Sequence, residues 1–199
     1  MPRPSRKQQI LESLAQQLEI QSAKRITTAS LAEAAGVSEA ALYRHFASKA
    51  QIFEALIGFA EESVFTRINQ ILEEYKKTPE RCYYMIYLML AFAERNPGIT
   101  RVLLGDALTG ENERLHARVE QFFLRIESQF KQVLREANLR GEAEAAASEA
   151  LTARLLTDWV EGRMHHFRRS TFKESPLDEL EECWRILEPA LFSQPEGKH

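Results

Sequence analysis

The segment spanning residues 26–49 restricts the fold more than any other part of the chain. It reads as two short helical stretches with Gly36 between them. Thr28 and Ser38 are the predicted N-caps, because their side-chain oxygens can accept from the first backbone amides of each helix. Gly36 follows the first helix at a position where the backbone commonly takes positive φ. Two short helices around such a turn are typical of a helix-turn-helix unit.

The second helix of this pair has an outer face suited to a DNA groove. Val37 and Leu42 are expected to fill the wedge between the two helices. Ala40 and Ala41 keep the start of the second helix slim enough for a major groove. Three polar side chains are expected to point toward the phosphates: Tyr43, His45 and Lys49. From these residues alone, a small helical wedge inside a larger bundle is the alternative.

The remainder of the chain also predicts helices. The whole chain contains only 8 Gly and 7 Pro. Three of the prolines follow a capping residue, in Thr78-Pro79, Asn96-Pro97 and Ser175-Pro176. Ser48 and Gln51 form a capping-box pattern. Helices are predicted near residues 5–20, 49–75, 79–94, 97–104, 111–138, 144–169 and 176–192, and the Ala-rich piece 142–147 is read as a strong helix former. With the first pair, these predict an all-α fold of about nine helices.

Composition and charge place this chain among soluble globular proteins. Apolar residues make up 44% and charged residues 28%. Residues 1–57 hold seven Lys or Arg and five Asp or Glu, whereas residues 58–199 hold nineteen and twenty-four. A basic head on an acidic body fits a small DNA-contacting domain joined to a larger one. The longest apolar run, 85–93, is too short to span a bilayer, and no apolar signal-peptide core follows the basic N-terminus. Cys82 and Cys183 do not make a disulfide framework, so a cytoplasmic location is expected.

Catalytic chemistry is not indicated. His165 and His166 are adjacent, so on a helix they point about 100° apart and cannot share a metal. No Cys or His pair has zinc spacing, and neither a Gly-rich phosphate loop nor a nucleophile motif is present. We therefore expect no catalytic residue, no cofactor and no metal.

Residues 26–49 resemble the signature of the TetR family of DNA-binding regulators, including the run Leu-Tyr-x-His-Phe and the trailing Lys. The resemblance implies a recognition helix over residues 39–46 and phosphate contacts from Thr27, Tyr43, His45 and Lys49. The full predicted DNA-binding set is Thr27, Thr28, Ser38, Glu39, Ala40, Ala41, Tyr43, Arg44, His45 and Lys49. Ala40 departs from the family, which often has Gly there, so the backbone is expected to approach DNA slightly less closely.

The same resemblance implies how the chain is organised. A three-helix DNA-binding domain (1–48) would precede a helical regulatory and dimerisation domain (49–192), with a disordered tail (193–199). A homodimer would read palindromic double-stranded DNA, because one helix-turn-helix makes too few contacts. The predicted seam is apolar and lies on the last two helices: Leu151, Leu155, Leu156, Trp159, Val160, Met164, Phe167, Trp184, Ile186, Leu187 and Leu191. Burial within one subunit is the alternative for these residues.

A narrower resemblance covers most of the chain. The segments 37–46, 66–69, 93–103 and 167–173, with shorter matches between them, are similar to the nucleoid-occlusion (SlmA) family. That family binds chromosomal sites and antagonises the division GTPase FtsZ. The resemblance implies a nucleoid-associated protein with a surface groove for the FtsZ C-terminal tail. The matching positions are Phe59, Arg67, Arg95, Asn96 and Arg101.

The residues leave two interpretations of the implied groove open. On a helix over 49–75, Phe59 points about 120° away from the centre of the apolar stripe, with Arg67 at the edge of the stripe on the same side. This pair suits a peptide with apolar and acidic groups, but a second core contact is equally compatible, and the family resemblance favours the peptide. Asn96 can also cap a helix. The alternative function is a transcriptional repressor released by a small apolar effector, with the aromatic and Met residues of 83–92 as pocket wall rather than core.

Overall fold

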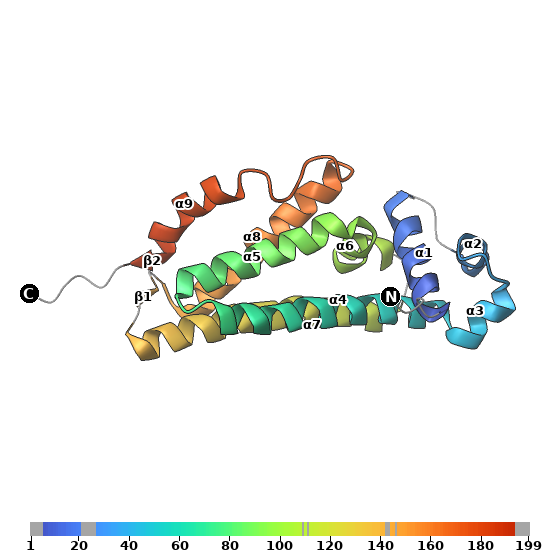
Figure 1. The fold of residues 1–199 in the computed structure, drawn as a ribbon, viewed down its shortest axis with the longest axis horizontal. Helices are drawn as coiled ribbons and strands as arrows, with labels where there is room; N and C mark the ends of the chain where they lie inside the picture. The colour runs from blue at the N-terminus through green and yellow to red at the C-terminus, as the bar shows by residue number, and fades with distance from the viewer. Residues whose placement is uncertain are drawn as a thin grey trace, which may run out of the picture. The chain divides into compact units, whose positions relative to one another are not determined.

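The computed structural model describes residues 6–20, 27–108, 110, 112–141, 144–145 and 147–193 (Figure 1). Those residues form nine α-helices, one 3-10 turn and two strands of two residues each. The predicted all-α class is confirmed. The chain divides into two compact units, one containing residues 1–62 and 95–119 and the other residues 63–94 and 120–199.

The first unit is a small helical body. Its elements are α1 (Arg6–Ile20), α2 (Thr28–Ala34), α3 (Glu39–His45), the first half of α4 (Lys49–Glu74), α6 (Pro97–Leu103), the turn η1 (Asp106–Leu108) and the start of α7 (Glu113–Arg140). Ile10, Leu14 and Leu18 form the buried stripe of α1. Every residue of α6 from Gly98 to Leu103 is buried. Burial on this scale fixes α1 and α6 against each other.

The second unit holds the longer helices. It contains the end of α4, α5 (Thr78–Arg95), most of α7, α8 (Glu149–Arg169), α9 (Leu180–Leu191) and the strands β1 (Glu144–Ala145) and β2 (Phe192–Ser193). Phe122 and Phe130 of α7 are fully buried, as are Met85 and Met89 of α5. The core interpretation is therefore right for the two methionines. Tyr87 on the same helix is 41% exposed.

A buried arginine closes the turn between α4 and α5. The Arg81 guanidinium donates from Nε to the Tyr75 carbonyl (2.8 Å) and from Nη2 to the Leu72 carbonyl (2.8 Å). Its Nη1 lies 3.5 Å from a Glu136 carboxylate oxygen on α7. The last carbonyls of a helix have no intrahelical partner and carry partial negative charge, so a cation stabilises them there. Arg81 thus joins α4, α5 and α7.

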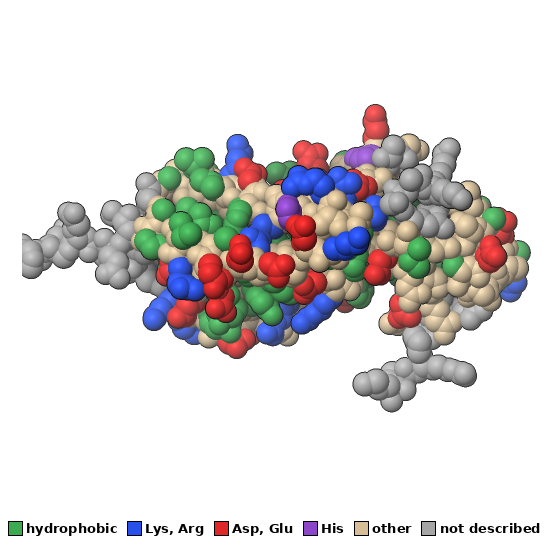
Figure 2. Space-filling model, turned by 90° about the horizontal axis from the view of Figure 1, so that it is seen from above, with side chains coloured by type: hydrophobic (Ala, Val, Ile, Leu, Met, Phe, Trp, Pro, Cys, Tyr) green, Lys and Arg blue, Asp and Glu red, His purple; other side chains and the backbone are tan. Residues whose placement is uncertain are grey.

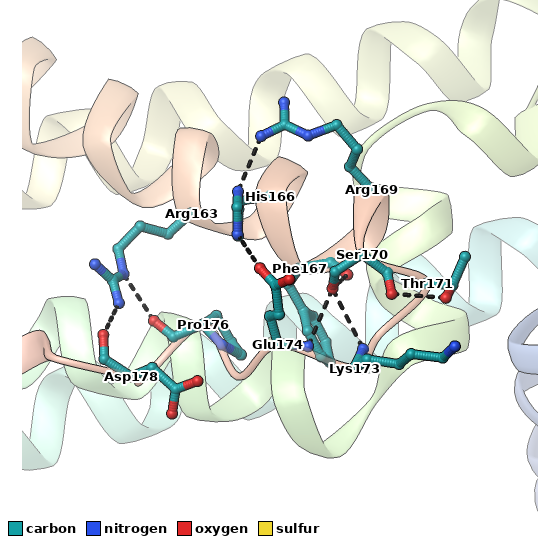
Figure 3. A network of polar contacts seen from close by, with 10 residues as sticks. All are labelled: Arg163, His166, Phe167, Arg169, Ser170, Thr171, Lys173, Glu174, Pro176 and Asp178. Carbon is teal, nitrogen blue, oxygen red and sulfur yellow. Dashed lines mark hydrogen bonds and ion pairs between the residues drawn. The ribbon is translucent and has the colours of Figure 1, made fainter.

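Helix α9 begins later than the sequence indicates. We expected it to start at Pro176, but it begins at Leu180, after Glu179 takes a left-handed φ of 56°. Arg163 of α8 donates to the carbonyls of Pro176 (2.7 Å) and Asp178, as Figure 3 shows. Because these carbonyls accept from a guanidinium of another helix, they do not accept the first intrahelical hydrogen bonds of α9. The predicted start was therefore wrong because of a side chain thirteen residues away.

The connection from α8 to α9 is held by local polar contacts (Figure 3). Ser170 Oγ accepts from the backbone amides of Lys173 (3.3 Å) and Glu174 (3.1 Å). Arg169 donates to Nδ1 of His166, which leaves the Nε2–H of that ring to donate to Glu174. These contacts hold the connection while Thr171 and Phe172 take positive φ. They give the family-like segment 167–173 a structural role.

The Ala-rich segment before α8 also differs from expectation. We expected helix from residue 144, but Glu144 and Ala145 form β1, which pairs antiparallel with β2. Ser148 is the N-cap of α8, and its side chain accepts from the Leu151 amide (3.3 Å). The pairing with residues far along the chain and a strong cap nearby outweigh the helix propensity of alanine. Residues 194–199 of the predicted tail lie outside the described residues.

The predicted apolar seam is divided between the two sides of α8 and α9. Leu156, Val160, Met164, Phe167 and Trp184 are buried within the chain. The remaining apolar side chains face outward to different degrees. Leu151, Leu155 and Ile186 are exposed, Ile186 to 76%, whereas Trp159, Leu187 and Leu191 are half-buried. Figure 2 shows hydrophobic side chains gathered over the end of this unit that holds α9. Burial within one subunit is therefore confirmed for the first five residues, and the dimer seam stays a prediction for those that face outward.

Within the described part of the chain, no helix has the length and apolar character to cross a membrane. Nor do three or more His, Cys, Asp or Glu side chains gather there as metal ligands would. Both cysteines are free thiols. Burial raises the pKa of Cys82 to about 12, so this thiol stays protonated and packs as a small apolar group.

The role of Arg81 gives a stability prediction. Arg81→Met keeps the apolar stem but removes both charge-assisted hydrogen bonds to the end of α4. We expect a loss of about 3 kcal/mol in the free energy of unfolding. Urea denaturation at fixed protein concentration measures it, with the exposed Lys77→Met as the control. A loss no larger than that of the control would contradict the proposed role of Arg81.

Candidate nucleic-acid interface and partner site

The turn between α2 and α3 is built as the sequence indicates. Gly36 has a φ of +60°. The amides of Gly36 and Val37 donate to the carbonyls of Glu33 (3.0 Å) and Ala32 (2.9 Å) and so close the end of α2. Leu42, predicted to fill the wedge, is buried. Ser38 caps α3, and its side chain accepts from the Ala41 amide (3.2 Å).

The outer face of α3 is open to solvent. Its exposed residues are Ser38, Glu39, Ala40, Tyr43, Arg44 and His45. Tyr43 is 47% exposed, and Ala41 is half-buried. Small residues at the start of the helix and polar groups at its end match what a major groove and its flanking phosphates accept.

The start of α2 differs from expectation by one residue. Thr27, rather than Thr28, is the N-cap, because its side chain accepts from the Ser30 amide (3.1 Å) and Ser30 Oγ accepts from the Thr27 amide (3.2 Å). Ser30 at the third helical position completes this capping box. The Thr27 hydroxyl proton is still able to donate to a phosphate oxygen. Thr28 Oγ1 instead donates to Glu39 (3.3 Å), which joins the starts of α2 and α3.

Two cations stand over buried aromatic rings beside the helix pair. Lys49 Nζ lies 5.4 Å from the centre of the Phe53 ring, and Lys7 Nζ lies 5.5 Å from that of Phe46. Phe46 is the C-cap of α3. Cation–π contacts position an ammonium group without neutralising its charge. Lys7 was not among the predicted residues, although the basic N-terminal stretch was the signal that could have identified it.

The predicted partner residues are placed in different surroundings. Phe59 is 47% exposed, whereas the apolar stripe of α4 is buried. Arg67 is exposed and donates to Gln70 Oε1 (2.8 Å). Arg95 is exposed as well. Phe59, Arg95, Asn96 and Arg101 belong to the first unit, and Arg67 belongs to the second.

Asn96 and Arg101 belong to the packing of α6. Asn96 is the N-cap residue, but its side chain makes no capping hydrogen bond, so the expected capping by the amide is not observed. Arg101 is only 8% exposed, and its Nη1 lies 4.0 Å from Asp106 of η1. A guanidinium in this position has little surface to offer a partner.

Arg118 supports the surface next to Phe59, and sequence reasoning missed it. From α7 it donates to the Glu54 carbonyl (3.0 Å) and to Glu61 Oε2 (2.7 Å) on α4. A Cβ on Gly58 would lie 3.2 Å from Nη2 of Arg118. Nothing local in the sequence signals contacts between residues 64 and 57 positions apart.

The comparisons with known proteins agree with this geometry. Residues 10–56 match the family described as bacterial regulatory proteins, tetR family, and residues 76–192 match the tetracyclin repressor-like C-terminal domain. The solved FadR regulator of fatty acid degradation from Bacillus halodurans has the same fold, with a TM-score of 0.80 and 13% identity over 94% of this chain and 96% of that one. The MbdR regulator from Azoarcus sp. gives a TM-score of 0.79 and 15% identity over 94% and 99%. The chain belongs to the TetR family of bacterial regulatory proteins.

Within that family the similarity is narrower. The nucleoid occlusion factor SlmA of Colwellia psychrerythraea is 52% identical over 185 residues, 93% of each chain. SlmA of Shewanella putrefaciens is 53% identical over 190 residues, 96% of each chain. Identity at this level over nearly the whole length places the chain among the SlmA nucleoid occlusion factors.

Tyr43 on the exposed face of α3 and Lys49 at the start of α4 give a DNA-binding prediction with two variants. Tyr43→Phe removes one hydroxyl that we expect to contact a phosphate, so affinity for a duplex selected from a random library should fall at least about tenfold. Lys49→Gln removes a charge instead, so the slope of log affinity against log salt should fall by about 0.9 for each lysine lost. Fluorescence anisotropy across a salt series distinguishes the two effects.

Glu12→Gln on the exposed side of α1 is the control for these variants. Unchanged affinity in Tyr43→Phe, or an unchanged salt slope in Lys49→Gln, would remove that residue from the interface.

Proposed function

We propose that this chain acts as a nucleoid-associated homodimer that binds palindromic DNA and, once bound, inhibits FtsZ assembly by holding the FtsZ C-terminal tail. The half-exposed ring of Phe59 carries the partner assignment. Phe59 is the large apolar side chain that the described part of α4 exposes, and an exposed aromatic ring gives a peptide an apolar anchor. The long similarity to SlmA factors supports the same assignment.

Exposed cations favour a peptide that also has an acidic segment. Arg67 and Arg95 present exposed guanidinium groups, which bind carboxylates in a planar, two-pronged geometry. Arg101 has a different role in this proposal, because it is buried beside Asp106. It orients α6 and η1, and the peptide contacts the exposed groups. Asn96 lies at the half-buried start of α6, where its backbone carbonyl accepts from Thr100.

The homodimer uses the outer faces of α8 and α9. Leu151, Leu155 and Gly162 lie within about 40° of one another on α8, and all three are exposed. A Cβ on Gly162 would meet no atom of its own chain within 4 Å. A glycine inside a helix costs about 1 kcal/mol relative to alanine. Close approach of a second copy of α8 accounts for a glycine at this position.

DNA favours the inhibitory state in this proposal. Binding of DNA by two heads orders the dimer, and a partner that prefers the ordered state binds it more tightly. By linkage, the FtsZ tail must then tighten DNA binding by the same factor.

The partner assignment is tested with a synthetic FtsZ C-terminal tail peptide, by fluorescence anisotropy at physiological salt. Saturable binding is expected, and Phe59→Ala and Arg67→Ala should each weaken it about tenfold or more while sparing DNA binding. Tyr87→Ala, an exposed aromatic on α5, and Lys131→Ala, an exposed cation on α7, are the matched controls. No binding up to millimolar peptide, with and without DNA, would favour a repressor released by a small apolar effector.

The seam is tested by charge insertion. Leu155→Arg places a cation in the proposed apolar interface, so sedimentation at micromolar concentration should show monomers where the unaltered chain gives dimers. Leu139→Arg is the control, since Leu139 is 80% exposed at the end of α7. A dimer that persists in Leu155→Arg would place the interface elsewhere.

A further inference from the structure

Helices α1 and α6 touch backbone to backbone at Gly98. A Cβ on Gly98 would lie 1.9 Å from the carbonyl oxygen of Ala15 and 2.8 Å from its carbonyl carbon. It would also lie 3.1 Å from Leu18 Cβ. The nearest atoms belong to a helix backbone, so no side-chain rotation can relieve the overlap. Any residue other than glycine at this position must push the two helices apart.

The helical conformation does not call for glycine at this position. Gly98 is not among the glycines with positive φ, and alanine favours a helix over glycine. The glycine therefore serves the close approach of α1. Both sides of the contact are packed, with Leu14 and Leu18 buried on α1 and residues 98–103 buried on α6. Packed backbones without a flexible side chain between them move together.

The Gly98–Ala15 contact connects the helix-turn-helix side of the first unit with the residues that precede α6. On one side, Gln17 of α1 donates from Nε2 to the Ser30 carbonyl of α2 (2.7 Å), which ties α1 to the helix-turn-helix. On the other side, Arg95 and Asn96 immediately precede α6. The DNA-reading helices and these predicted partner residues therefore belong to one compact unit.

We propose that the Gly98–Ala15 contact is the joint through which DNA binding by α2 and α3 alters the affinity of the partner site. The inference rests on the proposed function for the identity of the partner. DNA fixes α2 and α3, the hydrogen bond from Gln17 fixes α1, and the backbone contact at Gly98 fixes the start of α6. Arg95 and Asn96 are then held in one arrangement, so the peptide loses less conformational freedom of the protein when it binds.

The first test measures coupling in the full-length dimer. The Kd of the FtsZ tail peptide is measured with and without a saturating selected duplex, and the ratio of the two values is the coupling factor. We expect a factor of about five or more in the unaltered chain and below about two in Gly98→Ala. The ratio is insensitive to a uniform loss of affinity. If Gly98→Ala keeps the coupling factor of the unaltered chain, the proposed role of the Gly98–Ala15 contact is wrong.

The matched control is Ala15→Gly. It weakens the same helix pair through lower helix propensity but leaves the Ala15 carbonyl against Gly98. Coupling should persist in Ala15→Gly, and its loss there would show that general loosening of α1 is responsible. If Gly98→Ala does not fold, Gln17→Met removes the link between α1 and α2 without adding bulk at the helix contact. It should lower the coupling factor, and an undiminished factor would overturn the proposal.

A second readout does not need the peptide. Hydrogen exchange of the amides in residues 97–103 is compared with and without the duplex. DNA should slow exchange in α6 of the unaltered chain and of Ala15→Gly, but only in α2 and α3 of Gly98→Ala. Slowed exchange in α6 without any peptide binding would retain the joint and reject the partner assignment. Peptide binding without any effect of DNA on α6 would retain the partner and reject the joint.

Discussion

The backbone contact between Gly98 and Ala15 sets the geometry of the first unit. Because a Cβ at residue 98 would fall 1.9 Å from a carbonyl oxygen of α1, α6 can approach α1 only with glycine there. That approach buries α6 from Gly98 onward and leaves the outer faces of α2 and α3 for other contacts. Gln17 then ties α2 to α1 (2.7 Å). The helix-turn-helix is in this sense one part of a larger packed body.

In the second unit, α8 and α9 have apolar residues on two sides. One side packs into the core through Val160, Met164 and Trp184. The other leaves Leu155 and Ile186 in solvent. Figure 2 shows hydrophobic side chains gathered at the end of this unit that holds α9, and an exposed apolar patch is typical of an interface. The loop between the two helices is held by Arg163 and Ser170 (Figure 3), so α9 is fixed at its start by α8.

The surfaces assigned to DNA and to a protein partner differ in chemistry. The α3 surface combines small residues with Tyr43, Arg44 and His45, which suits a groove lined by phosphates. The surface proposed for the partner includes the half-exposed Phe59 and the exposed Arg95 of the first unit, which would suit a peptide having apolar and acidic groups. Membership of the SlmA nucleoid occlusion factors connects the two, because such a factor must detect DNA and act on cell division. The α3 face, Phe59 and Arg95 belong to the first unit, whereas Arg67 belongs to the second.

The sequence by itself determined the features that depend on short-range interactions. The cap at Ser38, the turn at Gly36 and the buried α4 stripe all follow from residues within four positions of one another. Only the tertiary structure decided where α9 begins, because Arg163 holds the carbonyls before it. It likewise made residues 144–145 a strand by pairing them with β2, and it buried Arg101 beside Asp106. Periodicity and capping report the chain's neighbours along the sequence, whereas these outcomes depend on groups brought together by packing, which a single sequence does not encode locally.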